Sequence, residues 1–489
     1  MDTKKLRQKI LDLAIRGRLV PQDPNDEPTS VLLERIRAEK ERLIKEGKIK
    51  RSKKSASDTP HYENVPFEVP EGWEWTTLGE LCSFLSRGKS PKYSEERKYP
   101  VFAQKCNLYD GDISLEKARF LDPETISKWS DEYKLIDGDI LVNSTGTGTV
   151  GRTRLFHSDV LGDYPFVVPD SHVSVIRSFE EIESKFVWAF LSSDYGQTYI
   201  EDNLAGSTNQ KELYIGVLDN MQFPLPPHEE QFRIVTTVDK WFTLIDTLES
   251  AKEDLQTSIA QAKSKILDLA IHGKLVPQDP NDEPAIELLK RINPKFTPCD
   301  NAHYENVPTN WTAILLGDLC FTINGLWKGK KPPFVNVGVI RNANFTKDCK
   351  LDYSNIAYLE VEAKQYEKRK LQYGDIIVEK SGGSDNQPVG RTILFEKTEG
   401  EYSFSNFTSV LRIYDGYPAL PEYLNMYLQA VYQTGITKRM QTQTTGIHNL
   451  IFDQFLAIPI KLPPLAEQRR IINKVSELSQ ILDNISAEL

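Results

Sequence analysis

Apolar residues recur with helical spacing along residues 229–272, a stretch that contains neither Gly nor Pro. They form two series that follow a seven-residue repeat, interrupted only at Lys252: Ile234, Trp241, Leu248, Leu255, Ala262 and Leu269, and Val238, Ile245, Ile259 and Ile266. A heptad repeat sustained over the whole stretch predicts a coiled-coil helix, roughly 66 Å long at 1.5 Å per residue. We expect Gly273 to end this helix.

The sequences of both halves of this helix are repeated elsewhere in the chain. Its back half recurs at the N-terminus, where residues 9–28 and 265–284 are identical at 18 of 20 positions. Its front half recurs at the C-terminus, where IKLPPLAEQRRII (460–472) resembles PLPPHEEQFRIV (224–235). The chain is therefore a circularly permuted internal repeat, which predicts a pseudo-two-fold molecule.

The permutation supplies a partner for the long helix within the same chain. The head and tail segments continue the two apolar series, so we expect them to pair antiparallel with the central helix. This pairing would bring the two chain termini close together near Lys252. An intermolecular coiled coil is the alternative.

The two segments between the helices share short sequence motifs at their beginnings and in their middles. Both begin with HYENVP, followed by a Trp and an LGELC or LGDLC sequence, and both contain a β-like run that ends in Val-Gly-Arg (135–152 and 371–391). Strand-like runs are mixed with helical ones, which predicts two α/β (α+β) domains of the same fold. The sequences diverge between the shared motifs, so we expect the surfaces to differ.

These motifs divide the chain into seven segments. They are the N-terminal half-helix of the spacer (1–28), a helix plus basic linker arm (29–59), a first globular domain (60–228), the central long helix (229–284), a linker (285–301), a second globular domain (302–465) and a C-terminal helix (466–489). The offset between copies falls from 256 to 242 along the repeat, so the first copy carries 14 extra residues. The insertion lies in a basic stretch, Glu34–Lys54, with ten Lys or Arg against four Glu. A solvated charge run and a phosphate-contacting arm both fit it.

The overall composition bears on the cellular location of the protein, on nucleic-acid binding and on the state of its cysteines. A net charge of −10 is unusual for a nucleic-acid-binding protein, although it can conceal local basic surfaces. Five cysteines without a CxxC pair argue against zinc and disulfides, so we expect them to be reduced and partly buried. The chain has no long apolar run and no apolar core of a signal peptide, which predicts a cytoplasmic protein with no membrane partner.

Three polar loop pairs recur at matching places in the two domains. They are QKCN (104–107) with IRNAN (340–344), the two hairpin tips that end in Val-Gly-Arg, and GSTNQKEL (206–213) with TTGIHNL (444–450). Lysines also alternate with aromatic residues at 86–93 and 326–334. Such side chains bind phosphates and base edges, although each residue alone fits an ordinary polar turn equally well. The candidate DNA-binding residues are Lys89, Lys105, Asn107, Asn143, Ser144, Thr147, Arg152, Ser207, Thr208, Asn209, Lys211, Lys328, Lys330, Arg341, Asn344, Lys380, Ser381, Ser384, Asn386, Arg391, Gln443, Thr444 and His448.

Catalytic motifs are missing from the sequence. Residues 146–151 match GxGxxG, but the RTRLFHS that follows indicates a strand rather than the helix a dinucleotide site requires. The second copy lacks the pattern altogether. There is no P-loop, no HExxH and no methyltransferase Pro-Pro-aromatic motif, and the seven histidines are scattered. We predict neither a catalytic residue nor a metal site.

The repeated KILDLAI…LVPQDPNDEP segments, the divergent domains and the LPP…EQ helix starts resemble the specificity subunits of type I restriction–modification systems, most closely the IB class. The resemblance covers essentially the whole chain. It implies two target-recognition domains separated by helices, each recognising one half of a bipartite, asymmetric double-stranded DNA target. It also implies two docked methyltransferase subunits, with restriction subunits joining them.

The resemblance further implies that the chain itself is non-catalytic. S-adenosylmethionine, ATP and Mg²⁺ would then bind the partner subunits, and adenine N6 methylation would be the partner's reaction. Two other functions remain open: a stand-alone fused methyltransferase or nuclease, and a coiled-coil scaffold that binds no DNA.

Overall fold

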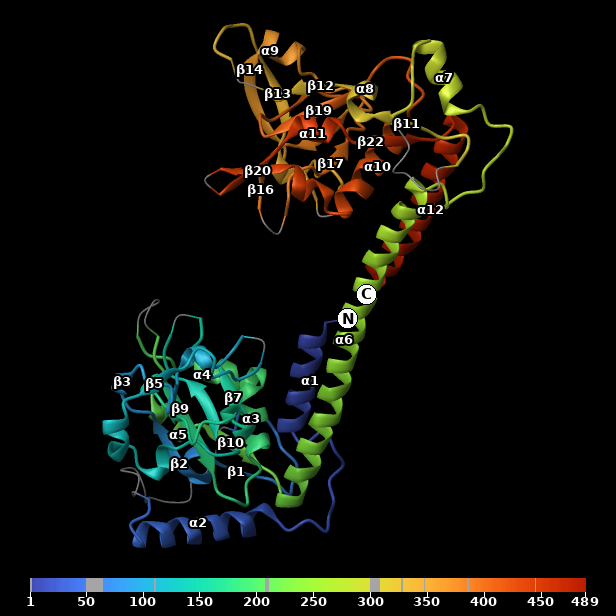
Figure 1. The fold of residues 1–489 in the computed structure, drawn as a ribbon. Helices are drawn as coiled ribbons and strands as arrows, with labels where there is room; N and C mark the ends of the chain where they lie inside the picture. Colours follow the sequence, from blue (N-terminus) through green and yellow to red (C-terminus); the bar gives the residue numbers. More distant parts are fainter. Residues whose placement is uncertain are drawn as a thin grey trace. The chain divides into compact units, whose positions relative to one another are not determined.

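The computed structural model divides the chain into two compact units, residues 1–251 and residues 252–489 (Figure 1). It describes residues 2–49, 65–109, 111–146, 148–206, 211–299, 308–326, 329–346, 348–384, 387–444 and 446–489. The shared HYENVP sequences fall largely outside these ranges. No helix within them is long and apolar enough to cross a membrane.

The first unit contains one globular domain and two spacer helices. Its elements are α1 (Thr3–Ile15), α2 (Thr29–Lys45), β1 (Glu74–Thr77), β2 (Cys82–Arg87), β3 (Tyr93–Ser94), β4 (Pro100–Phe102), β5 (Arg119–Leu121), β6 (Ile140–Asn143), β7 (Thr153–Leu155), β8 (Val168–Pro169), β9 (Val173–Ser178), α3 (Ser184–Ser192), α4 (Asp194–Asp202), α5 (Ile215–Asp219), β10 (Gln222–Leu225) and the beginning of α6 (His228–Ile271). The strand predicted after Val-Gly-Arg is present as β7.

The second unit repeats this arrangement. After the end of α6 it contains α7 (Ala285–Ile292), β11 (Thr312–Leu315), α8 (Leu316–Leu319), β12 (Cys320–Asn324), β13 (Phe334–Ile340), β14 (Ala357–Glu362), α9 (Ala363–Glu367), β15 (Ile376–Glu379), β16 (Ser381–Gly383), β17 (Thr392–Leu394), β18 (Tyr402–Phe404), β19 (Thr408–Ile413), α10 (Pro421–Gln433), β20 (Gln441–Thr444), β21 (Ile447–Leu450), α11 (Phe452–Leu456), β22 (Pro459–Leu462) and α12 (Leu465–Glu488).

Equivalent sheets form the two domains. A four-stranded sheet has the order β2-β9-β6-β7 in the first domain and β12-β19-β15-β17 in the second. A second sheet pairs β4 antiparallel with β5 and parallel with β8, as β13 pairs with β14 and β18. The first and last strands of each domain also pair, β1 with β10 and β11 with β22. The two domains therefore share the predicted mixed α/β fold.

The spacer helices run antiparallel within each unit. In the first unit, Arg7 of α1 binds Asp246 of α6 at 2.6 Å, and in the second, Lys263 of α6 binds Asp483 of α12 at 2.5 Å. Gly17 and Gly273, at φ of +64° and +65°, lie just beyond the repeated helix ends. The antiparallel pairing predicted from the repeat is therefore present in both units. The closeness of the two termini concerns both units together and stays a prediction.

The two apolar series of the long helix differ in burial. Val238, Ile245 and Ile259 of one series are at most 6% exposed, whereas Trp241 and Leu248 of the other are 45% and 43% exposed. The other series is uneven, because Ile234 at its beginning is buried whereas Trp241, Leu248 and Leu255 in the middle of the helix are exposed. These three side chains form an exposed apolar surface.

The basic stretch near the N-terminus is a helix whose cations are largely paired. Arg35 binds Glu27 and Glu181, Arg42 binds Glu39 and Glu46, and Arg37 binds Glu80. Its equivalent α7 ends nine residues earlier relative to α2, at Ile292 rather than at a counterpart of Lys45. The described part of the stretch is a paired surface rather than a free cationic arm, and residues 50–59 lie outside the described ranges.

Candidate nucleic-acid interface

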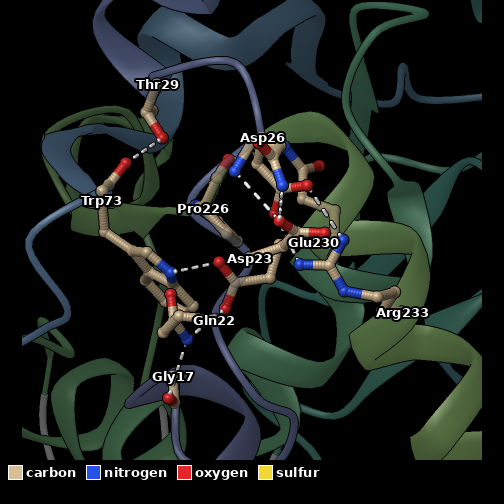
Figure 2. A network of polar contacts seen from close by, with 12 residues as sticks. Gly17, Gln22, Asp23, Asp26, Thr29, Trp73, Pro226, Glu230 and Arg233 are labelled. Atoms are coloured by element: carbon tan, nitrogen blue, oxygen red, sulfur yellow. Dashed lines mark hydrogen bonds and ion pairs between the residues drawn. The ribbon is translucent and has the colours of Figure 1, made fainter.

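A buried polar network joins the start of α6 to the loop after α1 (Figure 2). The Glu230 carboxylate, 1% exposed, accepts hydrogen bonds from Trp73 Nε1 at 3.0 Å and Gln22 Nε2 at 2.7 Å. Arg233 Nη1 and Nη2 hold the two carboxylate oxygens of Asp26 at 3.0 Å and 2.5 Å. These contacts bind the repeated Gln-Asp-Pro-Asn-Asp loop to the helix.

The second unit contains the same network atom for atom. Glu467 accepts from Trp311 Nε1 at 3.0 Å and from Gln278 Nε2 at 2.6 Å, while Arg470 Nη2 binds Asp282 at 2.6 Å. Burial raises the pKa of both central carboxyls, Glu230 and Glu467. The repeated sequence therefore forms a repeated structural joint.

The joint also connects each helix to its globular domain. Gln231 accepts from the backbone N–H of Glu183, which precedes α3, at 2.9 Å. Its equivalent Gln468 accepts from the backbone N–H of Leu420, which precedes α10, at 2.8 Å. The direction of each domain relative to its own helix is therefore fixed by these hydrogen bonds.

The three predicted polar loops of the first domain come together in space. Gln104 Nε2 donates to Thr145 Oγ1 at 2.5 Å, which joins the QKCN loop to the hairpin tip. The Leu213 N–H donates to the Ser144 carbonyl at 2.8 Å, which joins the third loop to the same tip. The structure therefore gathers these segments into one loop cluster at the end of β6.

The second domain gathers the equivalent loops in the same way. Asn342 Nδ2 donates to the Ser381 carbonyl at 2.6 Å, and Ser381 Oγ bonds Asn449 Oδ1 at 2.6 Å. Strands β16, β21 and β20 form a small sheet from the hairpin tip and the third loop. Each domain thus presents one composite polar surface, as expected if the recurring loops act together.

The candidate residues divide into four groups by their surroundings. Exposed are Lys105, Lys211, Lys330, Ser384 and Gln443; half-buried are Lys89, Arg152, Arg341, Lys380 and Ser381; buried are Asn107, Asn143, Ser144, Asn344, Arg391 and His448. Thr147, Ser207, Thr208, Asn209, Lys328 and Asn386, and the side chain of Thr444, lie outside the described residues. Contact with DNA stays a prediction for the first two groups.

The buried candidate residues make contacts inside their own domains. Asn107 Nδ2 donates to Asn143 Oδ1 at 2.8 Å, and Asn344 Nδ2 donates to the Asn355 carbonyl at 2.9 Å, so these amides hold loops together inside their domains. Arg391 is 8% exposed and its guanidinium is bound to Glu379. In this structure Asn107, Asn143, Asn344 and Arg391 therefore hold the loops in place. Contact of the buried residues with DNA stays a prediction.

Other cationic and aromatic side chains lie close to the loop clusters. Lys89 Nζ lies 3.9 Å from the ring centroid of Tyr133 and donates to the Lys128 carbonyl at 3.0 Å, so its charge is already engaged. Tyr109, which sequence analysis did not select, is 88% exposed beside the first cluster. Alignment of the loops could have identified Gln104 and Asn342 as the residues that join the first loop of each domain to the hairpin tip. Nothing in the sequence indicates that the side chain of Tyr109 is exposed.

The residue types that commonly bind metal ions are dispersed over the described residues. None of their His, Cys, Asp and Glu side chains form a group of three or more placed to hold a metal ion. All five cysteines are free, and burial raises the thiol pKa of Cys82 and of its equivalent Cys320 to about 12, which keeps them protonated. The sequence prediction of reduced, partly buried cysteines is confirmed.

The exposed apolar positions of the spacer helices are repeated as well. Glu230 and Glu467 are equivalent, 237 residues apart, and the same offset relates Leu244 to Ile481. Leu244 and Ile481 are 48% and 49% exposed. One turn on, Leu248 and Ile485 are 43% and 40% exposed. Each unit therefore carries the same uncovered apolar surface, here called the helix patch.

Comparison with known proteins identifies the family. Residues 70–257 and 308–489 match the model of the type I restriction modification DNA specificity domain. The specificity subunits of the Escherichia coli type I restriction enzymes EcoEI and EcoAI are each 28% identical, over 99% of this chain and 90% of their own length.

A solved chain shares the fold. It comes from work on complex assembly and conformational transition of the type I R-M system, and it is 19% identical over 86% of this chain and 94% of its own, with a TM-score of 0.54. The two family matches cover most of the 489 residues. The chain therefore belongs to the family of type I restriction–modification DNA specificity proteins.

Proposed function

We propose that this chain is the DNA specificity subunit of a type I restriction–modification complex. The first and second domains each recognise one half of a bipartite, asymmetric DNA target, and the spacer helices set the gap between the halves. The observation that carries this proposal is the pair of loop clusters, which have equivalent architecture and different side chains. Equivalent positions with divergent chemistry are what two independent half-site readers require.

Methylation mapping tests this function directly. The chain is co-expressed with its candidate methyltransferase subunit in a host free of adenine methylation, and N6-methyladenine is mapped by long-read sequencing. We expect two short specified blocks around a fixed unspecified gap. An assembled complex that leaves no sequence-specific methylation would contradict the proposal. Methylation by the purified chain alone, with S-adenosylmethionine, would instead indicate a stand-alone enzyme.

The helix patch supports two methyltransferase subunits per chain. A row of two exposed apolar side chains, four residues apart on one side of a helix, indicates a surface that packs against a further helix. The row occurs twice at equivalent positions, so it fits two copies of one partner. In this arrangement S-adenosylmethionine binds the methyltransferase subunits, and ATP and Mg²⁺ serve the restriction subunits that join the assembly.

Charged substitutions in each patch test this stoichiometry. Leu244→Glu with Leu248→Glu should remove one methyltransferase copy, and Ile481→Glu with Ile485→Glu the other, because a buried unpaired carboxylate is costly. Native mass spectrometry should show the complex falling from two partner copies to one in each case. Ser250→Glu and Ser476→Glu, at exposed polar positions of the same helices, are the matched controls. Retention of both copies in the two double variants would exclude the patch as the docking site.

A further inference from the structure

Two equivalent arginines end the hairpins of the two loop clusters. Arg152 and Arg391 both follow Val-Gly, and each donates from Nη1 to the carbonyl of an equivalent residue, Asn107 at 2.6 Å and Phe345 at 3.5 Å. The backbone positions are the same. Any difference in what the two guanidinium groups can do therefore comes from the side chains around them.

In the second domain the arginine charge is neutralised internally. Glu379, the last residue of β15, binds Arg391 through two contacts, Nε–Oε2 at 2.7 Å and Nη2–Oε1 at 3.2 Å. The two side chains are 10% and 3% exposed. The ring of Phe345, itself 7% exposed, lies 5.4 Å from the guanidinium carbon. Arg391 and Glu379 therefore form an ion pair in the interior of the second domain.

In the first domain the carboxylate is replaced by an amide. Asn143, the last residue of β6, occupies the position of Glu379 and is bonded to Asn107. Among the described residues, Arg152 has no carboxylate partner, and it is half-buried rather than buried. Its guanidinium carbon lies 5.7 Å from the ring centroid of Tyr109, whose side chain is 88% exposed.

We propose that Arg152 and Tyr109 together bind the DNA of the first half-site. The guanidinium contacts a backbone phosphate, and the exposed ring packs against the base or sugar of a neighbouring nucleotide. An uncompensated cation beside an exposed aromatic ring is the combination that tracks a nucleic-acid strand. This proposal rests on the proposed DNA-reading function and adds that Arg391, the equivalent arginine of the second domain, does not contact DNA.

The test uses the complex assembled with its methyltransferase subunits and a duplex that carries the mapped target. Affinity is measured as a function of salt concentration for Arg152→Ala, Tyr109→Ala and Tyr109→Phe. Arg152→Ala should weaken binding and reduce the slope of log affinity against log salt by about 1, as loss of one phosphate contact does. Tyr109→Ala should weaken binding roughly 5- to 150-fold with the slope unchanged, whereas Tyr109→Phe should keep most of the affinity.

The location of the contact is tested separately. With 5-iodouracil placed through the first half-site, the wild-type complex should crosslink at the peptide that contains Tyr109. Ile136→Ala, which removes another exposed apolar side chain beyond the opposite end of β6, should leave affinity unchanged. Affinity within twofold of wild type for both Arg152→Ala and Tyr109→Ala, together with an unchanged salt slope for Arg152→Ala, would overturn this proposal. A wild-type complex without target preference would instead overturn the proposed function.

Discussion

A single residue at a strand end decides the role of each hairpin arginine. The two Val-Gly-Arg sequences are identical, so the sequence predicted one role for Arg152 and Arg391. The deciding residue is Glu379 in one domain and Asn143 in the other, far enough upstream that only the antiparallel pairing of β15 with β17, and of β6 with β7, brings it to the arginine. Burial of individual loop side chains could not be predicted for the same reason.

Removal of the two arginines should therefore destabilise the protein to different extents. Arg391→Ala leaves Glu379 buried without a cation, which should destabilise the second domain by about 3–5 kcal/mol. Arg152→Ala loses one hydrogen bond at a half-buried position and should cost about 1 kcal/mol. Hydrogen exchange of the β15 and β17 amides reports the first loss. Equal effects of the two variants on stability would contradict the assignment of Arg391 as an internal ion pair.

The Glu230 joint should make the first unit's stability depend on pH. Burial raises the pKa of this carboxyl above its usual value of 4.5, so the folded state favours the protonated form. The carboxyl's contribution is complete below the unfolded pKa and is lost as pH rises through the folded pKa. The stability advantage of wild type over Glu230→Gln should consequently be larger at pH 5 than at pH 8 in urea unfolding. Glu229→Gln, at an exposed neighbour, should show no such trend.

At the scale of elements, the long helix and its antiparallel partners were predictable because apolar periodicity and glycine stops are local signals. The heptad pattern does not indicate how much of each apolar series is buried. Periodicity shows which side chains can be covered, but not how many neighbours cover them. Within one chain a single helix covers the Val238 and Ile245 side and leaves Trp241 and Leu248 for another partner.

Gly17 illustrates an element end that only glycine fits. Its φ is +64°, and a Cβ atom there would lie 2.4 Å from Cγ of Pro70. Gly17→Ala should destabilise the first unit by more than about 1 kcal/mol, through both backbone strain and the clash. Gly47→Ala is the matched control, since φ is +70° but nothing lies within 4 Å. Thermal unfolding should show the larger loss for Gly17→Ala. Equal losses would mean that the clash is relieved by movement of Pro70.

At the scale of the molecule, duplication was the most informative feature of the sequence. It predicted two domains of one fold, antiparallel pairing of the helices, and polar loops at matching places in the two domains. It did not predict which loop residues are exposed, because the loops are where the copies diverge and where contacts between distant segments fix each side chain. The architecture therefore followed from the sequence, and the detailed interface did not.

The spacer length should set the gap in the DNA target. Four helical residues inserted between Ala251 and Lys252 add about 6 Å and about 400° of rotation, close to one full turn. We expect the unspecified gap to lengthen by about two base pairs at roughly 3.4 Å each, with both half-sites unchanged. Replacing residues 250–253 by the same tetrapeptide, with no change in length, is the control. An unchanged gap in the methylation map of the insertion variant would contradict the proposal that the length of α6 sets the gap.

Each domain is expected to recognise its half-site independently of the other, because the duplicated spacer helices hold the two domains at equivalent positions. The most direct measurement replaces residues 312–461 by the equivalent residues 74–224, so that both positions carry the first domain, and maps N6-methyladenine in the assembled complex. We predict an inverted repeat of the first half-site around the original gap. Methylation that keeps the original second half-site, or that abandons the first, would contradict the claim.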